Sequence, residues 1–151
     1  MLKLSKKTDY AIILLAHLGE EEAPVSAQEM ATHYKLPYPM VANILKQLVS
    51  SGLVESSRGK HGGYFLIIPA DEINLAEIIL VTDSQLNLVE CAHDEEICKV
   101  HQCCPTRRPL LALHNKIQQF VKETTLAAII RDAEPINLTE KGISYETTDL
   151  S

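Results

Sequence analysis

The chain has 151 residues, of which 46% are hydrophobic, enough to bury one core with an appended element and within the usual size of a single domain. No apolar run approaches the roughly 20 residues of a membrane-spanning helix, and the basic N-terminus soon includes Asp9 and His17, so we expect neither membrane insertion nor a signal peptide. The net charge of −6 argues against indiscriminate binding to nucleic acid.

The charge and the cysteines are unevenly distributed. Residues 1–61 carry seven basic and six acidic side chains, a balance of +1, so the remainder carries −7. The first part can therefore still present a basic surface to DNA. All four cysteines lie between Cys91 and Cys104, a pattern typical of ligands in a reducing compartment rather than of a disulfide framework, and we expect a cytoplasmic protein.

The first predicted helix begins after Ser5, which can cap it, and continues to Gly19. Its apolar residues recur at helical spacing: Tyr10, Ile13, Leu14 and Leu18. Asp9 lies in the first turns, where a negative charge suits the helix dipole. On spacing alone, this structural role is sufficient to explain Asp9.

Two short helices joined by a tight turn are predicted next. Ser26 and Glu29 form a capping-box pattern that opens the first, which continues through Tyr34. The second is predicted from about Pro39 to Ser51, with Gly52 as its C-terminal stop. Its exposed face carries small, amide and basic side chains: Ala42, Asn43, Lys46, Gln47 and Ser50. Such a face suits a DNA major groove, although a plain solvated face would look similar.

A β-hairpin is predicted directly after these helices, with strands at residues 53–57 and 64–68. Its tip carries Arg58, Lys60 and His61 among three glycines, which allow the backbone to approach a partner closely. A helix-turn-helix followed by a hairpin with a basic tip favours a wing that contacts a minor groove over an ordinary hairpin.

A helix capped by Asn74 and Glu77 is predicted through about Val81, and a long helix begins near Thr106. The long helix has the spacing of a coiled-coil seam in Leu110, Leu113, Ile117, Phe120 and Thr124. The seam could pack on the same chain, but a reader of symmetric operators is two-fold, so we favour a homodimer. A short helix to about Arg131 follows.

These patterns predict a mainly α fold with a small β-hairpin: a winged helix-turn-helix domain plus a long dimerisation helix. We assign residues 1–83 to the DNA-binding domain, 84–105 to a cysteine-rich loop, and 106–132 to the dimerisation helix and the short following helix. Residues 133–151 form a polar tail that we expect to be poorly ordered. There is no phosphate-cradling glycine loop and no nucleophile elbow, so we expect neither an enzyme nor a small-molecule substrate.

The cysteine loop has the spacing Cys91-x6-Cys98-x5-Cys104, with Cys103 adjacent to the last. Thiolates at these separations can converge on an iron–sulfur cluster, and the paired knuckles of structural zinc sites are absent. Spacing alone leaves three other readings open: a thiol-disulfide switch using Cys103 or Cys104, a zinc site completed by a histidine, or cysteines without a metal.

From Leu4 to about Leu126 the sequence resembles the Rrf2 family of winged-helix regulators, which includes iron–sulfur assembly regulators and nitric-oxide-responsive repressors. The resemblance rests on LSKKTDYAI at the start, GLVESSRGKHGGYFL over the wing, and three cysteines before a long helix. Within the family the chain is most similar to regulators of the SUF iron–sulfur assembly operon.

The resemblance implies a homodimer that binds a palindromic double-stranded operator and carries one iron–sulfur cluster, 2Fe-2S or 4Fe-4S, per subunit. Cys91, Cys98 and Cys104 match the cluster ligands, with Cys103 as an alternate. Asp9 matches an acidic residue that is a further ligand from the opposite subunit in some relatives. Combined with the basic and exposed positions, the resemblance predicts this DNA-binding set: Ser26, Pro39, Ala42, Asn43, Lys46, Arg58, Lys60 and His61.

Two departures from the family pattern leave questions open. Ala42 stands where the cluster-assembly relative has a glutamate, which leaves the operator sequence open, and Cys103 is an additional thiol. We therefore predict a repressor of iron–sulfur assembly genes that senses cluster status, or redox or nitric-oxide stress. The alternatives are a cofactor-free or thiol-switch regulator of the same fold controlled by a protein partner and, with less support, an electron carrier.

Overall fold

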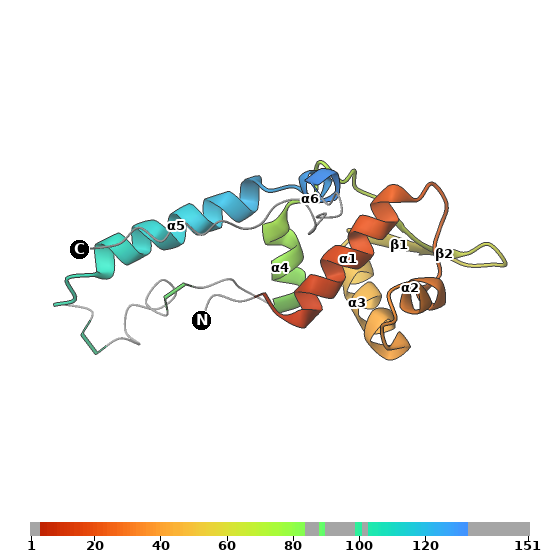
Figure 1. The fold of residues 1–151 in the computed structure, drawn as a ribbon, viewed down its shortest axis with the longest axis horizontal. Coiled ribbons are helices and arrows are strands. Elements are labelled where there is room, and N and C mark those ends of the chain that lie inside the picture. Colours follow the sequence, from red (N-terminus) through yellow and green to blue (C-terminus); the bar gives the residue numbers. More distant parts are fainter. Residues whose placement is uncertain (1–3, 84–87, 90–98, 101–102, 133–151) are drawn as a thin grey trace, which may run out of the picture.

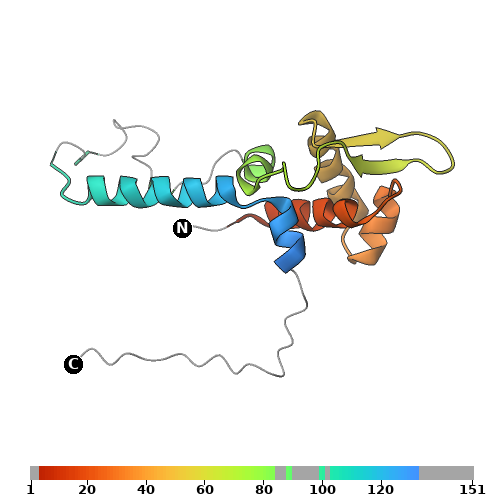
Figure 2. The same ribbon diagram turned by 90° about the horizontal axis from the view of Figure 1, so that it is seen from above.

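The structure is a computed structural model that describes residues 4–83, 88–89, 99–100 and 103–132. Within these ranges the chain forms six helices and one two-stranded antiparallel hairpin, which confirms the predicted mainly helical fold. Helices α1, α2, α3 and α4 gather beside the hairpin, with α6 against α1, whereas α5 extends away from this body (Figures 1 and 2). None of the described helices is long and apolar enough to cross a membrane.

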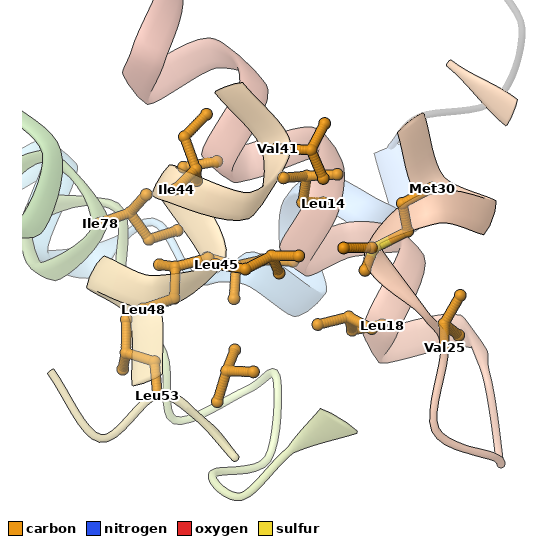
Figure 3. Packing of buried hydrophobic residues seen from close by; sticks show 14 of the residues in the cluster. Leu14, Leu18, Val25, Met30, Val41, Ile44, Leu45, Leu48, Leu53 and Ile78 are labelled. Atoms are coloured by element: carbon orange, nitrogen blue, oxygen red, sulfur yellow. The ribbon is translucent and has the colours of Figure 1, made fainter. Parts of the chain in front are cut away.

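The core is built from helices that each bury one apolar stripe. Helix α1 spans Lys6–Glu20, α2 spans Ala27–His33 and α3 spans Tyr38–Ser50. Residues spaced three or four positions apart on α1 and α3 point toward one another in Figure 3. The fully buried side chains include Leu14, Leu15, Met30, Val41, Ile44, Leu45, Leu48 and Ile78. This packing leaves the opposite face of α3 directed outward.

The starts of α1 and α2 are capped as predicted. The Ser5 hydroxyl accepts a hydrogen bond from the Thr8 N–H at 3.1 Å. At α2, the Glu29 N–H donates to Ser26 Oγ at 3.1 Å, and the Ser26 N–H donates to Glu29 Oε2 at 2.8 Å. The capping box is therefore complete, and it satisfies N–H groups that no carbonyl within the helix can reach.

The turn between α2 and α3 contains no glycine. Lys35 adopts a left-handed conformation with φ of 54°, the Lys35 N–H donates to the Thr32 carbonyl, and the Leu36 N–H donates to the Ala31 carbonyl at 2.9 Å. These bonds are those of a Schellman motif, which ends α2 and redirects the chain into α3. The Gly52 stop predicted for α3 is confirmed by its φ of 78° and by the Leu53 N–H donating to the Leu48 carbonyl.

The hairpin strands begin and end at different residues from those predicted. Strand β1 spans Val54–Ser57 and β2 spans Gly63–Leu66, with Val54 opposite Leu66 and Ser57 opposite Gly63. Leu53 belongs to the C-terminal cap of α3, so β1 starts one residue later than predicted. Gly63 still pairs with Ser57, so β2 starts one residue earlier than predicted, and it ends at Leu66, two residues before the predicted end.

Helix α4 spans Leu75–Asp83, two residues beyond the predicted end, and its Asn74–Glu77 capping pair forms with bonds of 3.0 and 3.1 Å. Helix α5 spans Arg107–Glu123, and α6 spans Leu126–Asp132 and packs on α1. The Leu75 N–H donates to the Thr124 carbonyl at 2.8 Å, which ties the C-terminal end of α5 to the start of α4. Most of the predicted cysteine loop and the whole predicted tail, residues 133–151, lie outside the described residues.

Candidate DNA-binding surface and cysteine site

Helix α3 presents the predicted reading face to solvent. Pro39, Asn43 and Lys46 are exposed and Ala42 is half-buried, while the opposite stripe of α3 lies in the core. Two large side chains that the sequence reasoning missed lie beside them: Tyr38, 49% exposed, and Met40. Their apolar character off the buried stripe is the signal that could have identified them. The N-terminal part of a second helix in a helix-turn-helix is the part that contacts base edges.

The hairpin carries the basic tip that was predicted as a wing. Arg58, Lys60 and His61 are all exposed between β1 and β2. Strand β2 is held close to the tip of the hairpin by backbone bonds in both directions between Val25 and Tyr64, at 3.0 and 2.8 Å. The hairpin lies at the opposite end of the molecule from α5, on the same side as α2 and α3 (Figures 1 and 2).

Ser26 occupies a structural position within the predicted DNA-binding set. Its hydroxyl and its N–H are both used in the capping box at the start of α2, and its side chain is half-buried. The hydrogen bonds to Ser26 hold the pKa of the Glu29 carboxyl below its usual value. Ser26 therefore fixes the helix that packs on α3, and a contact from Ser26 to DNA stays a prediction.

Two of the four cysteines, Cys103 and Cys104, are described, just before α5. Cys103 is exposed, and its S–H donates to the Val100 carbonyl at 3.6 Å. Cys104 is half-buried, with its sulfur 3.4 Å from the hydroxyl of Thr106, the N-cap residue of α5. Cys91 and Cys98 lie outside the described residues.

The environment of Cys104 favours its thiolate. The Thr106 side chain, followed by the Thr106 backbone N–H, lowers the pKa of the Cys104 thiol, and the backbone N–H and charge of Arg107 act in the same direction. These groups lie at the start of a helix, where exposed N–H groups stabilise negative charge. A thiolate is the form of cysteine that binds metals.

The described residues do not by themselves complete a metal centre. In residues 4–83, 88–89, 99–100 and 103–132, no group of three histidine, cysteine, aspartate or glutamate side chains is placed to hold a metal ion. Asp9, the predicted ligand from the opposite subunit, is exposed in the first turn of α1. A centre that uses the predicted set therefore needs Cys91 and Cys98 or a second subunit.

The predicted coiled-coil seam of α5 faces solvent in the single chain. Phe120 is 67% exposed and Leu113 is 47% exposed, and Leu110 is also exposed. Of the described side chains on α5, only Val121 is buried. The other two seam residues, Ile117 and Thr124, are half-buried, so the seam is exposed over part of its length on a helix that extends away from the body (Figure 2).

Comparison with known proteins identifies the fold and the family. Residues 4–132 match the Rrf2 family model, described as an iron-dependent transcriptional regulator. The chain belongs to the Rrf2 family. The curated Rrf2 relatives include the HTH-type transcriptional regulator NsrR of Geobacillus kaustophilus, 30% identical over 138 residues, covering 87% of this chain and 91% of that protein. The regulator IscR of Vibrio atlanticus is 25% identical over 93% of this chain and 82% of its own.

Solved Rrf2 structures share the whole fold. CymR, described as the global cysteine regulator of B. subtilis, has a TM-score of 0.74 at 26% identity and covers 89% of this chain and 100% of its own. IscR of T. potens has a TM-score of 0.69 at 26% identity, and the match covers 95% of this chain and 97% of that chain. The predicted family and the winged helix-turn-helix fold are confirmed, and the protein is a transcription regulator with a DNA-binding domain.

Proposed function

We propose that the protein is a homodimeric repressor of iron–sulfur assembly genes, whose operator binding is set by an iron–sulfur cluster on Cys91, Cys98 and Cys104. The observation that supports this proposal is the thiolate-favouring position of Cys104 at the start of α5, the helix that carries the exposed seam. Relatives named NsrR and IscR agree with it.

The donor chemistry at the start of α5 fits such a cluster. Iron–sulfur clusters are held mainly by thiolates, and the hydrogen bonds from Thr106 favour that form of Cys104. Cys103 instead directs its S–H to the Val100 carbonyl, so we assign the ligand role to Cys104. Asp9 of the second subunit is the proposed further ligand. When bound, the cluster supplies a centre that reacts with oxidants and nitric oxide.

The chain's own residues connect this site to DNA binding. Thr106 begins α5, so a change in the bonds of Cys104 acts directly on the first turn of that helix. If α5 pairs with its copy through Leu113 and Phe120, a change there alters how the two reading helices are spaced. Half-sites for paired recognition helices are about one turn of DNA, roughly 34–36 Å, apart, so spacing controls operator fit.

Anaerobic reconstitution tests the ligand assignment. We expect parent protein purified without oxygen to be coloured, to contain iron and sulfide, and to show visible absorption. Cys91→Ala, Cys98→Ala and Cys104→Ala are each expected to lose the absorption and most of the iron, because each removes a thiolate ligand. Cys103→Ala is the matched control on the adjacent residue and is expected to retain both.

Operator affinity completes this test. A palindromic operator is first selected from random duplexes, and loaded and chelator-stripped proteins are then titrated by fluorescence anisotropy. We expect their affinities to differ by about tenfold or more, within the usual range of coupling between two sites. If the Cys91, Cys98 and Cys104 variants all take up iron like the parent, the ligand assignment is wrong.

A thiol-switch regulator is the second candidate, because Cys103 and Cys104 are adjacent thiols and the fold is similar to that of CymR. It predicts colourless protein in the absence of oxygen and an operator affinity that changes on treatment with peroxide and is restored by dithiothreitol. Cys104→Ala would abolish that response. If affinity is unchanged by both cluster loading and oxidation, control by a protein partner is favoured instead.

A separate prediction concerns Arg58 at the tip of the hairpin. Arg58→Ala is expected to weaken operator binding by about 10- to 100-fold, since an arginine in a narrow minor groove contributes roughly 1–3 kcal/mol. The measurement is operator anisotropy at several salt concentrations, where loss of phosphate contacts also reduces the slope of log K against log salt.

Glu55→Ala is the matched control for Arg58, because Glu55 is also exposed on the hairpin but is acidic. Its removal is expected to leave affinity unchanged or slightly higher. An Arg58→Ala protein that binds the operator like the parent at all salt concentrations would remove the wing from the interface.

A further inference from the structure

A hydrogen-bonded cluster of polar side chains joins the start of α1 to the end of α4. Thr8 and Thr82 are buried, and their hydroxyl oxygens are 2.6 Å apart. The Asp83 carboxylate accepts from the Thr8 hydroxyl at 2.7 Å and from the Ser5 N–H at 3.2 Å, and Lys7 Nζ donates to the Thr82 carbonyl at 3.0 Å. The bonds join residues more than 70 positions apart in the sequence. They form a polar contact between α1 and α4 beside the apolar core.

The cluster stabilises two helix ends, the start of α1 and the end of α4. Ser5 is the N-cap residue of α1, so the carboxylate of Asp83 supplies an acceptor at the positive end of that helix. The hydrogen bonds from Ser5 and Thr8 accordingly hold the pKa of Asp83 below its usual range. On the other side, Lys7 satisfies a carbonyl in the last turn of α4, where a positive charge is favourable.

The position of α4 gives this cluster a role beyond stability. The first turn of α4 is bonded to the end of α5 through Leu75 and Thr124, and its last turn is bonded to α1 through the cluster. Buried Ile78 of α4 lies in the same core as Ile44 and Leu48 of the reading helix α3 (Figure 3). Helix α4 is therefore the element between residue 84, where the predicted cysteine loop begins, and α3.

We infer that Ser5, Thr8, Thr82 and Asp83 form a polar lock that positions α4 and transmits the state of the cysteine loop to the reading helix. This inference rests on the proposed function. The lock holds the last turn of α4 against the first turn of α1, so α4 cannot rotate locally. A strain that the loop exerts on α4 therefore changes the packing of α4 against α3. The lock also fixes the backbone next to Asp9, the proposed ligand to the second subunit's cluster.

Three variants test the lock. Thr82→Val keeps the shape of the side chain and removes its hydroxyl, whereas Thr82→Ser retains the hydroxyl. Ile79→Val trims a buried side chain of the same helix that lies outside the core cluster shared with α3, and it is the control for general loosening of α4. The readout is the ratio of operator affinities of loaded and chelator-stripped protein, measured with melting temperatures for all three.

If the lock transmits the signal, the parent ratio of about tenfold or more falls to less than about threefold in Thr82→Val and stays near the parent value in Thr82→Ser and Ile79→Val. A Thr82→Val ratio equal to that of the parent would overturn the inference while leaving the proposed function standing. If the parent protein takes up no cluster and its operator affinity is the same before and after chelation, the proposed function is wrong.

A second measurement does not need the cluster. In chelator-stripped protein, hydrogen exchange at the first turn of α1, including the Thr8 and Asp9 amides, is expected to quicken several-fold in Asp83→Ala and far less in Asp83→Asn, whose side-chain oxygen can still accept. Equal exchange in Asp83→Ala and the parent would show that the carboxylate does not hold the start of α1.

Discussion

Replacing Phe120 with aspartate is expected to convert the protein to a monomer and to lower its operator affinity by about 100-fold or more. Phe120 is 67% exposed in the single chain, on the seam of the helix that extends from the body. In a paired seam this ring would be buried against its copy, and a carboxylate there would be desolvated without a partner. Central aromatic residues commonly account for much of an interface's binding energy.

The loss of operator affinity follows from the loss of pairing. Two linked reading helices bind the second half-site at a high effective concentration, and a monomer loses this advantage. Because Phe120 makes little contact with the core, the melting temperature of the winged domain is expected to change by only a few degrees. The measurements are sedimentation equilibrium for oligomeric state and anisotropy for operator binding.

Asn115→Asp is the matched control for Phe120→Asp. Asn115 is exposed on α5 but lies off the Leu113–Phe120 stripe, so the same charge is added to the same helix outside the seam. The control is expected to remain a dimer with operator affinity close to that of the parent. A Phe120→Asp protein that sediments as a dimer would show that the subunits pair through another surface.

Local signals in the sequence located most of the helix ends. Ser5, the Ser26–Glu29 pair and Gly52 each act on backbone groups within a few residues, so their effect can be worked out from their neighbours alone. Helical spacing identified the buried stripe of α3 for the same reason, and the exposed stripe followed by elimination. The reading face of the site was therefore predictable.

Features that depend on distant partners were not predictable. Lys35 adopts a positive φ although lysine gives no signal for it, because two closing hydrogen bonds and the burial of neighbouring residues outweigh the local strain. Thr8 pairs with Thr82, 74 positions away, and nothing in either local sequence distinguishes this pair from solvated threonines. The start of β1 moved by one residue because the Leu53 N–H is used in the C-terminal cap of α3.

The sequence predicted which cysteines form the candidate site, but it predicted only part of the surroundings of each thiol. The spacing of the thiols could be counted, but the lowered pKa of Cys104 depends on how the chain enters α5 and places Thr106 beside the sulfur. Asp9 fits both the dipole role suggested by its position and the ligand role implied by the resemblance. The ligand role requires a second subunit and the dipole role does not. The sequence pattern of one chain cannot distinguish them, because it does not show how two subunits are arranged.

The second large effect is expected at Gly63, where alanine should destabilise the fold by about 2–4 kcal/mol. A Cβ on Gly63 would lie 2.6 Å from both the carbonyl carbon and the carbonyl oxygen of Val25, and backbone atoms cannot move aside as a flexible side chain can. The Val25–Tyr64 bonds at 3.0 and 2.8 Å would have to lengthen or break. Overpacking costs about 1–3 kcal/mol, and weakening of the two backbone bonds adds about 1 kcal/mol, the lower end of about 0.5–1.5 kcal/mol for each bond, which together give the expected range.

Gly52→Ala is the control that separates crowding from backbone strain. Gly52 has a φ of 78°, but a Cβ there would meet no atom within 4 Å, so only the conformational cost of about 1 kcal/mol applies. Urea unfolding of both variants measures the difference, with equal m-values as the check that the two-state comparison holds. Because the bonds between Val25 and Tyr64 hold β2 next to the tip of the hairpin, Gly63→Ala should also weaken operator binding through displacement of Arg58, whereas Gly52→Ala should not. Equal urea midpoints for the two variants would mean that the hairpin can shift from Val25 without cost, and the wing would then not be rigidly placed beside the reading helix.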